Sequence, residues 1–154
     1  MIVVDTEGFG ATEETDAYNN KILLFAILLS SYFIYNSVGS IDENSINNLN
    51  VIANLAREIQ KSNSKDDKVD EEFPSFLWLV RDFTLNIVDK SGYSMQPKDY
   101  LEQALELLKG SSDAIENKNK VRRMIKSFFK DRDCFTLVRP VETEDQLQKL
   151  YYLN

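Results

Sequence analysis

Asp5 and Gly8 stand three positions apart, directly after the apolar run Ile2-Val3-Val4. An aspartate at the carboxyl end of a buried strand can hold Mg²⁺ through water, and a glycine lets the backbone approach a phosphate closely. The same pattern also fits a strand that runs into a glycine-containing turn without any ligand. Asp5 and Gly8 are therefore candidate metal and phosphate residues, with a plain turn as the alternative.

A second candidate pair, Arg81 and Asp82, follows the apolar run of residues 75–80. A carboxylate at such a strand end can accept two hydrogen bonds from the N1 and N2 edge of guanine. Adenine lacks these donors, so one aspartate can select the base. An ion pair or a cap at the end of the strand is the alternative. Arg139 occupies the corresponding place after the last predicted strand.

Composition limits the classes of function. The chain has 154 residues, enough for one domain with a sizeable core, and its net charge of −7 argues against nucleic acid as a general partner. Cys134 is the single cysteine and the chain has no histidine. Intrachain disulfides, cysteine-based zinc sites, Ser-His-Asp and Cys-His catalysis and histidine metal sites are therefore excluded.

The apolar stretch of residues 22–35 does not have the length of a membrane span. Its 14 residues give about 21 Å of helix against a hydrocarbon core of about 30 Å. We expect a buried helix at residues 17–29 followed by a strand at residues 32–35, so the chain is predicted to contain no transmembrane segment.

The remaining pattern alternates helices with strands. Further strands are predicted at residues 75–80 and 134–138, with a polar loop at 61–72 and helices at about residues 40–60, 97–109, 116–129 and 142–152. This order predicts an α/β fold with a mostly parallel sheet and helices on both faces. Ligands bind such sheets at the carboxyl ends of the strands. The polar residues that we expect there are Asp5, Glu7, Asn36, Ser37, Arg81, Asp82 and Arg139.

Four segments in this order resemble the large GTPase domain of the guanylate-binding protein and atlastin group, closer to the guanylate-binding branch. They are Asp5-Thr6-Glu7-Gly8, the segment from Leu28 to Ser37, Leu79-Val80-Arg81-Asp82-Phe83 and Cys134-Phe135-Thr136-Leu137-Val138-Arg139-Pro140. The resemblance covers essentially the whole chain and implies a fold like that of the P-loop NTPases.

The resemblance also implies roles for single residues. Asp82 would contact guanine with support from Arg81, and Arg139 would belong to the loop that caps the base. Asp5 to Gly8 would lie beside the terminal phosphate and Mg²⁺, which Asp5 would hold through water, and Glu7 would belong to the catalytic water network. Many members carry Asp where this chain has Val138, a departure that concerns the details of the cap.

For the intact protein, the resemblance implies that GTP or GDP binds with Mg²⁺ and that GTP is hydrolysed. It also implies a homodimer formed through the nucleotide face, and a cytoplasmic location with possible peripheral association with membranes. Guanine nucleotide is the expected ligand, and nucleic acid is not an expected partner.

The phosphate-binding pattern Gly-x-x-x-x-Gly-Lys-Ser/Thr is absent from all 154 positions. We therefore expect residues 1–154 to form the carboxyl-terminal portion of a single, incomplete G domain that lacks the first strand, loop and helix. Such a chain is predicted to have no GTPase activity and no tightly bound cofactor. Two alternatives remain open: a non-catalytic, degenerate G domain that acts as a protein-interaction module, and an unrelated doubly wound domain.

Overall fold

The computed structural model describes residues 1–6, 16–50, 52, 73–89 and 91–152. Its centre is a three-stranded parallel sheet in the order β1-β2-β3, formed by β1 (Tyr32–Val38), β2 (Ser75–Arg81) and β3 (Arg132–Thr136). Tyr35 of β1 lies opposite Trp78 of β2, which lies opposite Cys134 of β3. The predicted α/β fold with a parallel sheet is confirmed.

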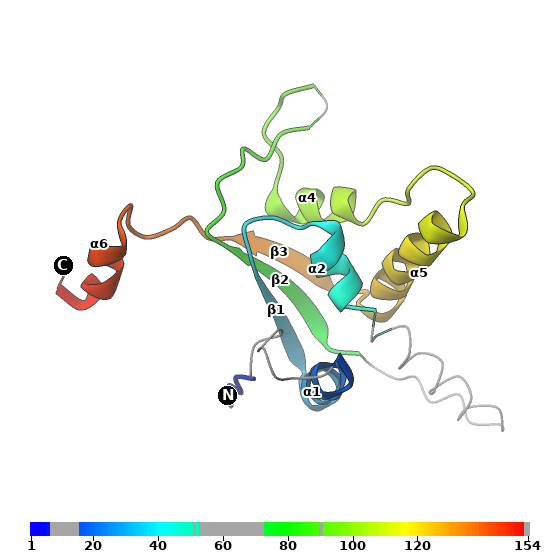
Figure 1. Ribbon diagram of the computed structural model, residues 1–154, viewed down its shortest axis with the longest axis horizontal. Helices are drawn as coiled ribbons and strands as arrows, with labels where there is room; N and C mark the ends of the chain where they lie inside the picture. Colours follow the sequence, from blue (N-terminus) through cyan, green and yellow to red (C-terminus); the bar gives the residue numbers. More distant parts are fainter. Residues whose placement is uncertain (7–15, 51, 53–72, 90, 153–154) are drawn as a thin grey trace.

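The helices in the described part of the chain are α1 (Asp16–Leu29), α2 (Glu43–Asn48), α4 (Pro97–Ala104), α5 (Asp113–Phe128), α6 (Glu144–Gln148) and a 3₁₀ turn, η1 (Leu150–Tyr152). α2, α4 and α5 lie on one side of the sheet, whereas α6 lies apart from them, beyond the end of β3 (Figure 1). In this part of the chain, no helix has both the length and the apolar character needed to cross a bilayer.

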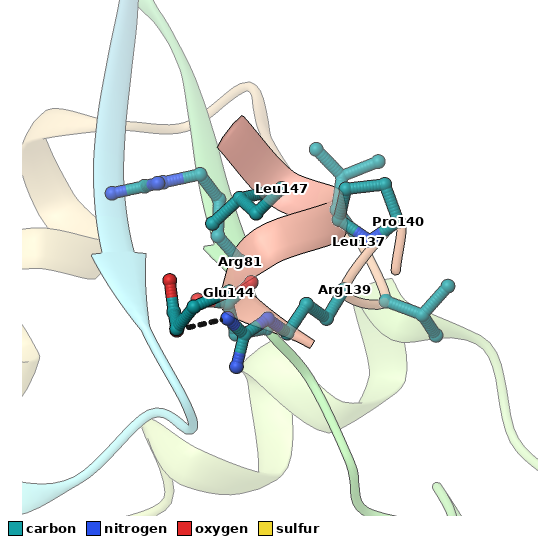
Figure 2. Close-up of a pocket in the computed structure, with 8 residues that line it drawn as sticks. Arg81, Leu137, Arg139, Pro140, Glu144 and Leu147 are labelled. Atoms are coloured by element: carbon teal, nitrogen blue, oxygen red, sulfur yellow. Dashed lines mark hydrogen bonds and ion pairs between the residues drawn. The ribbon is translucent and has the colours of Figure 1, made fainter. Parts of the chain in front are cut away.

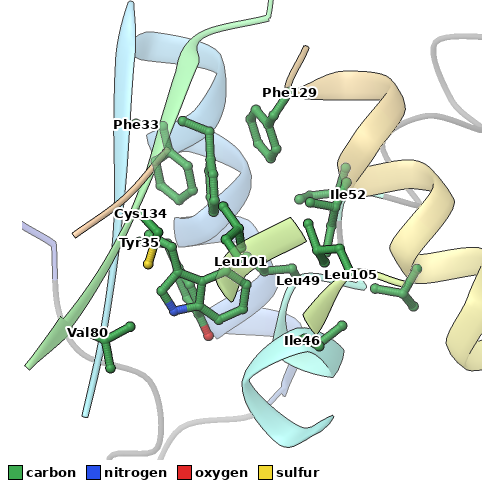
Figure 3. Close-up of a cluster of buried hydrophobic side chains, with 14 of the residues drawn as sticks. Phe33, Tyr35, Ile46, Leu49, Ile52, Val80, Leu101, Leu105, Phe129 and Cys134 are labelled. Atoms are coloured by element: carbon green, nitrogen blue, oxygen red, sulfur yellow. The ribbon is translucent and has the colours of Figure 1, made fainter. Parts of the chain in front are cut away.

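The core forms on one face of the sheet because side chains alternate between the faces of a strand. Alternate residues of the three strands are at most 7% exposed and pack with residues of α2, α4 and α5 (Figure 3): Phe33, Tyr35, Phe76, Trp78, Val80 and Cys134. The rings of Phe76 and Phe129 stack at 4.6 Å between centroids. Residues of opposite parity, such as Ile34 and Phe135, are 50% and 54% exposed.

The N-terminal apolar run does not form the strand that its sequence predicts. Ile2, Val3 and Val4 are 91%, 79% and 79% exposed, and residues 1–6 have no regular secondary structure. A strand requires a neighbour to satisfy its backbone groups, and the described sheet contains β1, β2 and β3 alone. β1, by contrast, extends to Val38, beyond the predicted end at residue 35.

Two predicted helices have different ends in the structure. α4 ends at Ala104, not at 109, and beyond this end the side chain of the buried Asn119 satisfies the backbone of Leu108. Asn119 accepts from the Leu108 N–H at 2.8 Å and donates to the Leu108 carbonyl at 3.0 Å. α5 begins at Asp113, three residues earlier than predicted, because Ser112 Oγ accepts from the Ile115 N–H and caps its first turn.

The other predicted helices and the last predicted strand differ from the structure in length or position. Helix α2 begins at Glu43, close to the predicted start at about residue 40, and ends at Asn48. The carboxylate of Asp42, which precedes it, accepts from the Ser45 N–H at 2.8 Å. Residues 53–60 of the longer predicted helix and the predicted loop at 61–72 lie outside the described residues. The last strand lies at residues 132–136, two positions earlier than predicted, and the last predicted helix is divided into α6 and η1.

A charged pair joins α2 to α5. Arg122 of α5 is 3% exposed and donates from Nη2 to Glu43 Oε1 in the first turn of α2, while Lys118 Nζ lies 3.2 Å from Glu43 Oε2. The hydrogen bond from Arg122 lowers the pKa of Glu43. This pair fixes the helix that follows β1 against the helix that precedes β3.

A second carboxylate, Glu102 of α4, joins three elements. It accepts from Arg132 Nε of β3 at 2.6 Å and lies 3.3 Å from Lys126 Nζ of α5. The hydrogen bond from Arg132 is the main cause of a pKa for Glu102 below its usual value of 4.5. The charged carboxylate therefore stabilises the fold above about pH 4.5, and this stabilisation is lost as the pH falls through the lowered pKa.

We expect Glu102→Gln to reduce the loss of stability between pH 5 and pH 3, because the variant has no carboxylate to protonate there. Urea unfolding at several pH values measures how steeply the free energy of unfolding changes with pH. Glu106→Gln, at an exposed position two residues after the end of α4, is the control. Equal slopes for wild type and Glu102→Gln would contradict this role for Glu102.

Candidate functional site

A pocket of about 420 Å³ lies at the carboxyl ends of β2 and β3 (Figure 2). The end of β2, the segment after β3 and helix α6 supply its walls: Arg81, Asp82, Leu137, Val138, Arg139, Pro140, Glu144 and Leu147. This is the sheet edge at which parallel α/β folds bind ligands. Its volume lies in the range of small-molecule sites.

The backbone turn at Arg81 and Asp82 is held from both neighbouring strands. The Arg81 carbonyl accepts from the Gly39 N–H at 2.8 Å, on the β1 side. On the β3 side, the Leu137 N–H donates to the Val80 carbonyl at 2.8 Å, and the Leu137 carbonyl accepts from the Phe83 N–H at 2.9 Å. Asp82 has a φ of 53°, a left-handed conformation that aspartate and asparagine adopt more readily than most residues. The three backbone hydrogen bonds therefore hold the main chain at Asp82 in this turn.

Gly39 donates the hydrogen bond that holds the Arg81 carbonyl on the β1 side, and its φ is +86°. We expect Gly39→Ala to lower the free energy of unfolding by about 1 kcal/mol, because an L residue is strained at this φ. A Cβ there meets no atom within 4 Å, so the backbone alone is affected. Urea unfolding measures the change.

Gly92→Ala is the matched control, because Gly92 has a φ of +84° and equally open surroundings but lies in the turn after Asp89. Both variants should lose similar stability, whereas only Gly39→Ala should weaken a ligand bound in the pocket. Equal binding by the two variants would argue against this role of Gly39.

The side chain of Arg81 is directed away from the pocket and towards β1 (Figure 2). Its Nε donates to Asn36 Oδ1 of β1 at 2.9 Å. Nearby, Trp78 Nε1 donates to Ser37 Oγ at 2.9 Å, so two consecutive polar residues of β1 hold side chains of β2. The sequence predicts Asn36 and Ser37 at this edge, and in the structure both contact β2.

Arg139 comes from the segment after β3 and forms an ion pair with Glu144 of α6 (Figure 2). Helix α6 starts with a capping box in which Thr143 Oγ1 accepts from the Gln146 N–H at 3.3 Å. This short helix places Glu144 and Leu147 at the pocket. Sequence reasoning did not select either residue, although the Thr-x-x-Gln spacing is a signal for the start of a helix.

The remaining predicted site residues lie elsewhere or outside the described residues. Asp5 is in the exposed N-terminal segment and is not among the residues that line the pocket. Glu7 and Gly8 fall outside the described residues. Cys134 is buried, and burial raises its pKa to about 12, so its thiol is not a nucleophile at neutral pH.

Comparison with known proteins gives a consistent result over the whole chain. The family model for the guanylate-binding protein N-terminal domain matches residues 1–154. Human guanylate-binding protein 7 is 37% identical over 155 residues, which cover 96% of this chain and 24% of that protein. Human guanylate-binding protein 1 is 36% identical over 162 residues, covering 97% of this chain and 27% of the relative.

The chain thus spans about a quarter of the length of these relatives. The family match extends from residue 1 to residue 154. The chain belongs to the guanylate-binding protein family, whose N-terminal domain model it matches over residues 1–154.

Proposed function

We propose that the pocket at the ends of β2 and β3 binds the guanine base of a guanine nucleotide. The observation that carries this proposal is the position of Asp82, which lines the pocket from a clamped left-handed turn. An ionised carboxylate accepts hydrogen bonds only, and guanine offers two adjacent donors at N1 and N2. Adenine has an acceptor at N1 and no amino group at C2, so Asp82 would reject it.

The other walls suit a flat heteroaromatic ring. Leu137, Pro140 and Leu147 supply apolar surface, and Arg139 supplies a planar guanidinium that can stack on a base. The Glu144 ion pair holds Arg139 at the pocket and joins the loop after β3 to α6. Binding would therefore combine apolar contact with the ring and polar recognition of its edge.

In the intact protein, we propose that the domain hydrolyses GTP with Mg²⁺. A magnesium ion bound with nucleotide takes one or two protein carboxylates, with phosphate and water as its other ligands. Asp5 fits this pattern as a single carboxylate that would hold the ion through water. Within the described residues, no group of three or more acidic, cysteine or histidine side chains forms a metal cage. The roles of Glu7 and Gly8 near the phosphate remain proposals from the resemblance.

We propose that this chain does not itself hydrolyse GTP. The sequence contains no Gly-x-x-x-x-Gly-Lys-Ser/Thr element, which cradles the phosphates and supplies the lysine and hydroxyl group that stabilise their charge. The pocket would therefore recognise the base without catalysis. For the intact protein, a homodimer through the nucleotide face and a cytoplasmic location also remain proposals.

Calorimetric titration of this chain with guanosine and adenosine tests the proposal. Guanosine should bind at least about tenfold more tightly, because adenosine leaves the Asp82 carboxylate unpaired. Phosphate release from GTP should equal that of buffer. Equal affinity for the two nucleosides, or no binding of guanosine, would contradict base recognition, and GTP turnover by the pure chain would contradict the proposed lack of catalysis.

A further inference from the structure

Arg81 lines the pocket at the end of β2, and among the described residues no carboxylate pairs with it. The ion pairs among described residues involve Lys118, Arg122, Arg123, Lys126, Arg132 and Arg139, and none includes Arg81. Its partner is the neutral amide oxygen of Asn36, which accepts from Nε. In the described part of the chain, the terminal nitrogens Nη1 and Nη2 make no hydrogen bond. The guanidinium is held in place and its charge is not neutralised.

The two arginines differ in what they offer a ligand. Arg139 is paired with Glu144 on the α6 side of the pocket, so this side carries a carboxylate that repels phosphate. Arg81 instead extends across to β1, where its Nε donates to Asn36 Oδ1 (Figure 2). A nucleotide bound in this pocket would therefore direct its phosphates towards the Arg81 guanidinium, where the charge is complementary.

We propose that Asn36 is a positioning residue, which holds the Arg81 guanidinium on the β1 side of the pocket to contact the phosphate of a guanine nucleotide. This inference rests on the proposed guanine site and assigns Arg81 and Asp82 to different parts of the ligand. Asp82 reads the base, and Arg81 donates from its terminal nitrogens to phosphate oxygens. Asn36 acts through Arg81 and keeps the guanidinium from folding back over the pocket.

An asparagine suits this position because its side chain is short and uncharged. The Asn36 amide oxygen orients Nε of Arg81 at 2.9 Å without neutralising the guanidinium. An aspartate would keep the hydrogen bond but would compete with phosphate for the same charge. The two substitutions Asn36→Ala and Asn36→Asp therefore separate loss of position from loss of charge.

The test compares guanosine with guanosine 5′-monophosphate by calorimetric titration of the 154-residue chain. In wild type the monophosphate should bind more tightly. Asn36→Ala should weaken the monophosphate about fivefold, and Asn36→Asp or Arg81→Gln about tenfold, which is the usual size of a charge-assisted hydrogen bond. Guanosine should change less than twofold in each variant, a split that general loss of structure would not produce.

Two further measurements define the mechanism. The double variant Asn36→Ala/Arg81→Gln should bind the monophosphate no more weakly than Arg81→Gln alone, because Asn36 has nothing left to position. The Arg81 Nε–H signal in nuclear magnetic resonance spectra should move in Asn36→Ala. Asn117→Ala, at an exposed asparagine of α5, is the matched control and should change neither measurement.

The outcomes distinguish this inference from the function on which it rests. If wild type binds neither guanosine nor the monophosphate, the guanine site is wrong and the role of Asn36 falls with it. If wild type binds both but Asn36→Ala weakens them equally, the base site stands and the phosphate role of Arg81 is overturned. Additive losses in the double variant would show that Asn36 does not act through Arg81.

Discussion

Replacing Asp82 by asparagine is expected to exchange the base preference of the pocket from guanine towards xanthine. The asparagine amide presents one acceptor and one donor, whereas the carboxylate presents acceptors only. Xanthine carries a donor at N1 and a carbonyl oxygen at C2, so it matches the amide, while the guanine amino group faces the new donor. The ratio of guanosine affinity to xanthosine affinity should fall about a hundredfold, because guanosine loses one hydrogen bond to residue 82 and xanthosine gains one.

This substitution is informative because it should leave the backbone unchanged. Asp82 has a φ of 53°, and asparagine tolerates this conformation as readily as aspartate. Competition titrations with the two nucleosides measure the ratio, and unfolding in urea should be close to that of wild type. Asp131→Asn, at an exposed position before β3, is the control. An unchanged ratio in Asp82→Asn would exclude Asp82 as the base-reading residue.

Replacing Glu43 by alanine is expected to lower the free energy of unfolding by about 3 kcal/mol, because Arg122 would keep a buried charge without its partner. Arg122 is 3% exposed, and Glu43 is the acidic residue that pairs with it in the described part of the chain. Glu43 itself is about one third exposed, so the expected loss lies at the lower end of the range for buried pairs. Urea unfolding of the variant measures the loss.

A matched pair on α5 supplies the control for this prediction. Glu116 also lies in the first turn of a helix and pairs with Arg123, but these side chains are 67% and 46% exposed. Glu116→Ala should therefore cost less than about 1 kcal/mol. The double variant Glu43→Leu/Arg122→Met should recover most of the loss, since it removes the unpaired charge. Similar losses of unfolding free energy for Glu43→Ala and Glu116→Ala would contradict a stabilising ion pair between Glu43 of α2 and Arg122 of α5.

Elements with a strong local pattern could be predicted from the sequence. The apolar run of residues 75–80 predicts a buried parallel strand, and β2 forms at Ser75–Arg81 with Phe76, Trp78 and Val80 at most 1% exposed. Helix α1 likewise has the predicted end at Leu29. In both segments, the apolar run and the polar residues after it are sufficient to predict where the element ends.

Features that depend on distant residues could not be predicted in this way. α4 stops at Ala104, and Asn119 from another helix satisfies the backbone of Leu108 beyond that end. The apolar residues Ile2 to Val4 have the composition of a strand, but they are exposed because no described strand pairs with them. Composition gives a tendency, whereas pairing and burial decide the outcome.

The same distinction applies to the pocket. Arg81, Asp82 and Arg139 could be selected because each directly follows an apolar run, and the structure lines one pocket with them. Glu144 and Leu147 reach it through the position of α6, which no local pattern gives. The hydrogen bond between Asn36 and Arg81 depends on strand register. Asn36 of β1 lies opposite Leu79 of β2, two residues before Arg81.

Mapping guanosine onto the backbone amide signals of this chain tests the central claim most directly. We predict that titration will shift the signals of Asp82, Leu137, Arg139 and Leu147, which line the pocket, while those of α5 stay in place. Adenosine at the same concentrations should leave the pocket signals unchanged. Guanosine shifts confined to residues away from the ends of β2 and β3, or identical shifts with adenosine, would contradict a guanine site in this pocket.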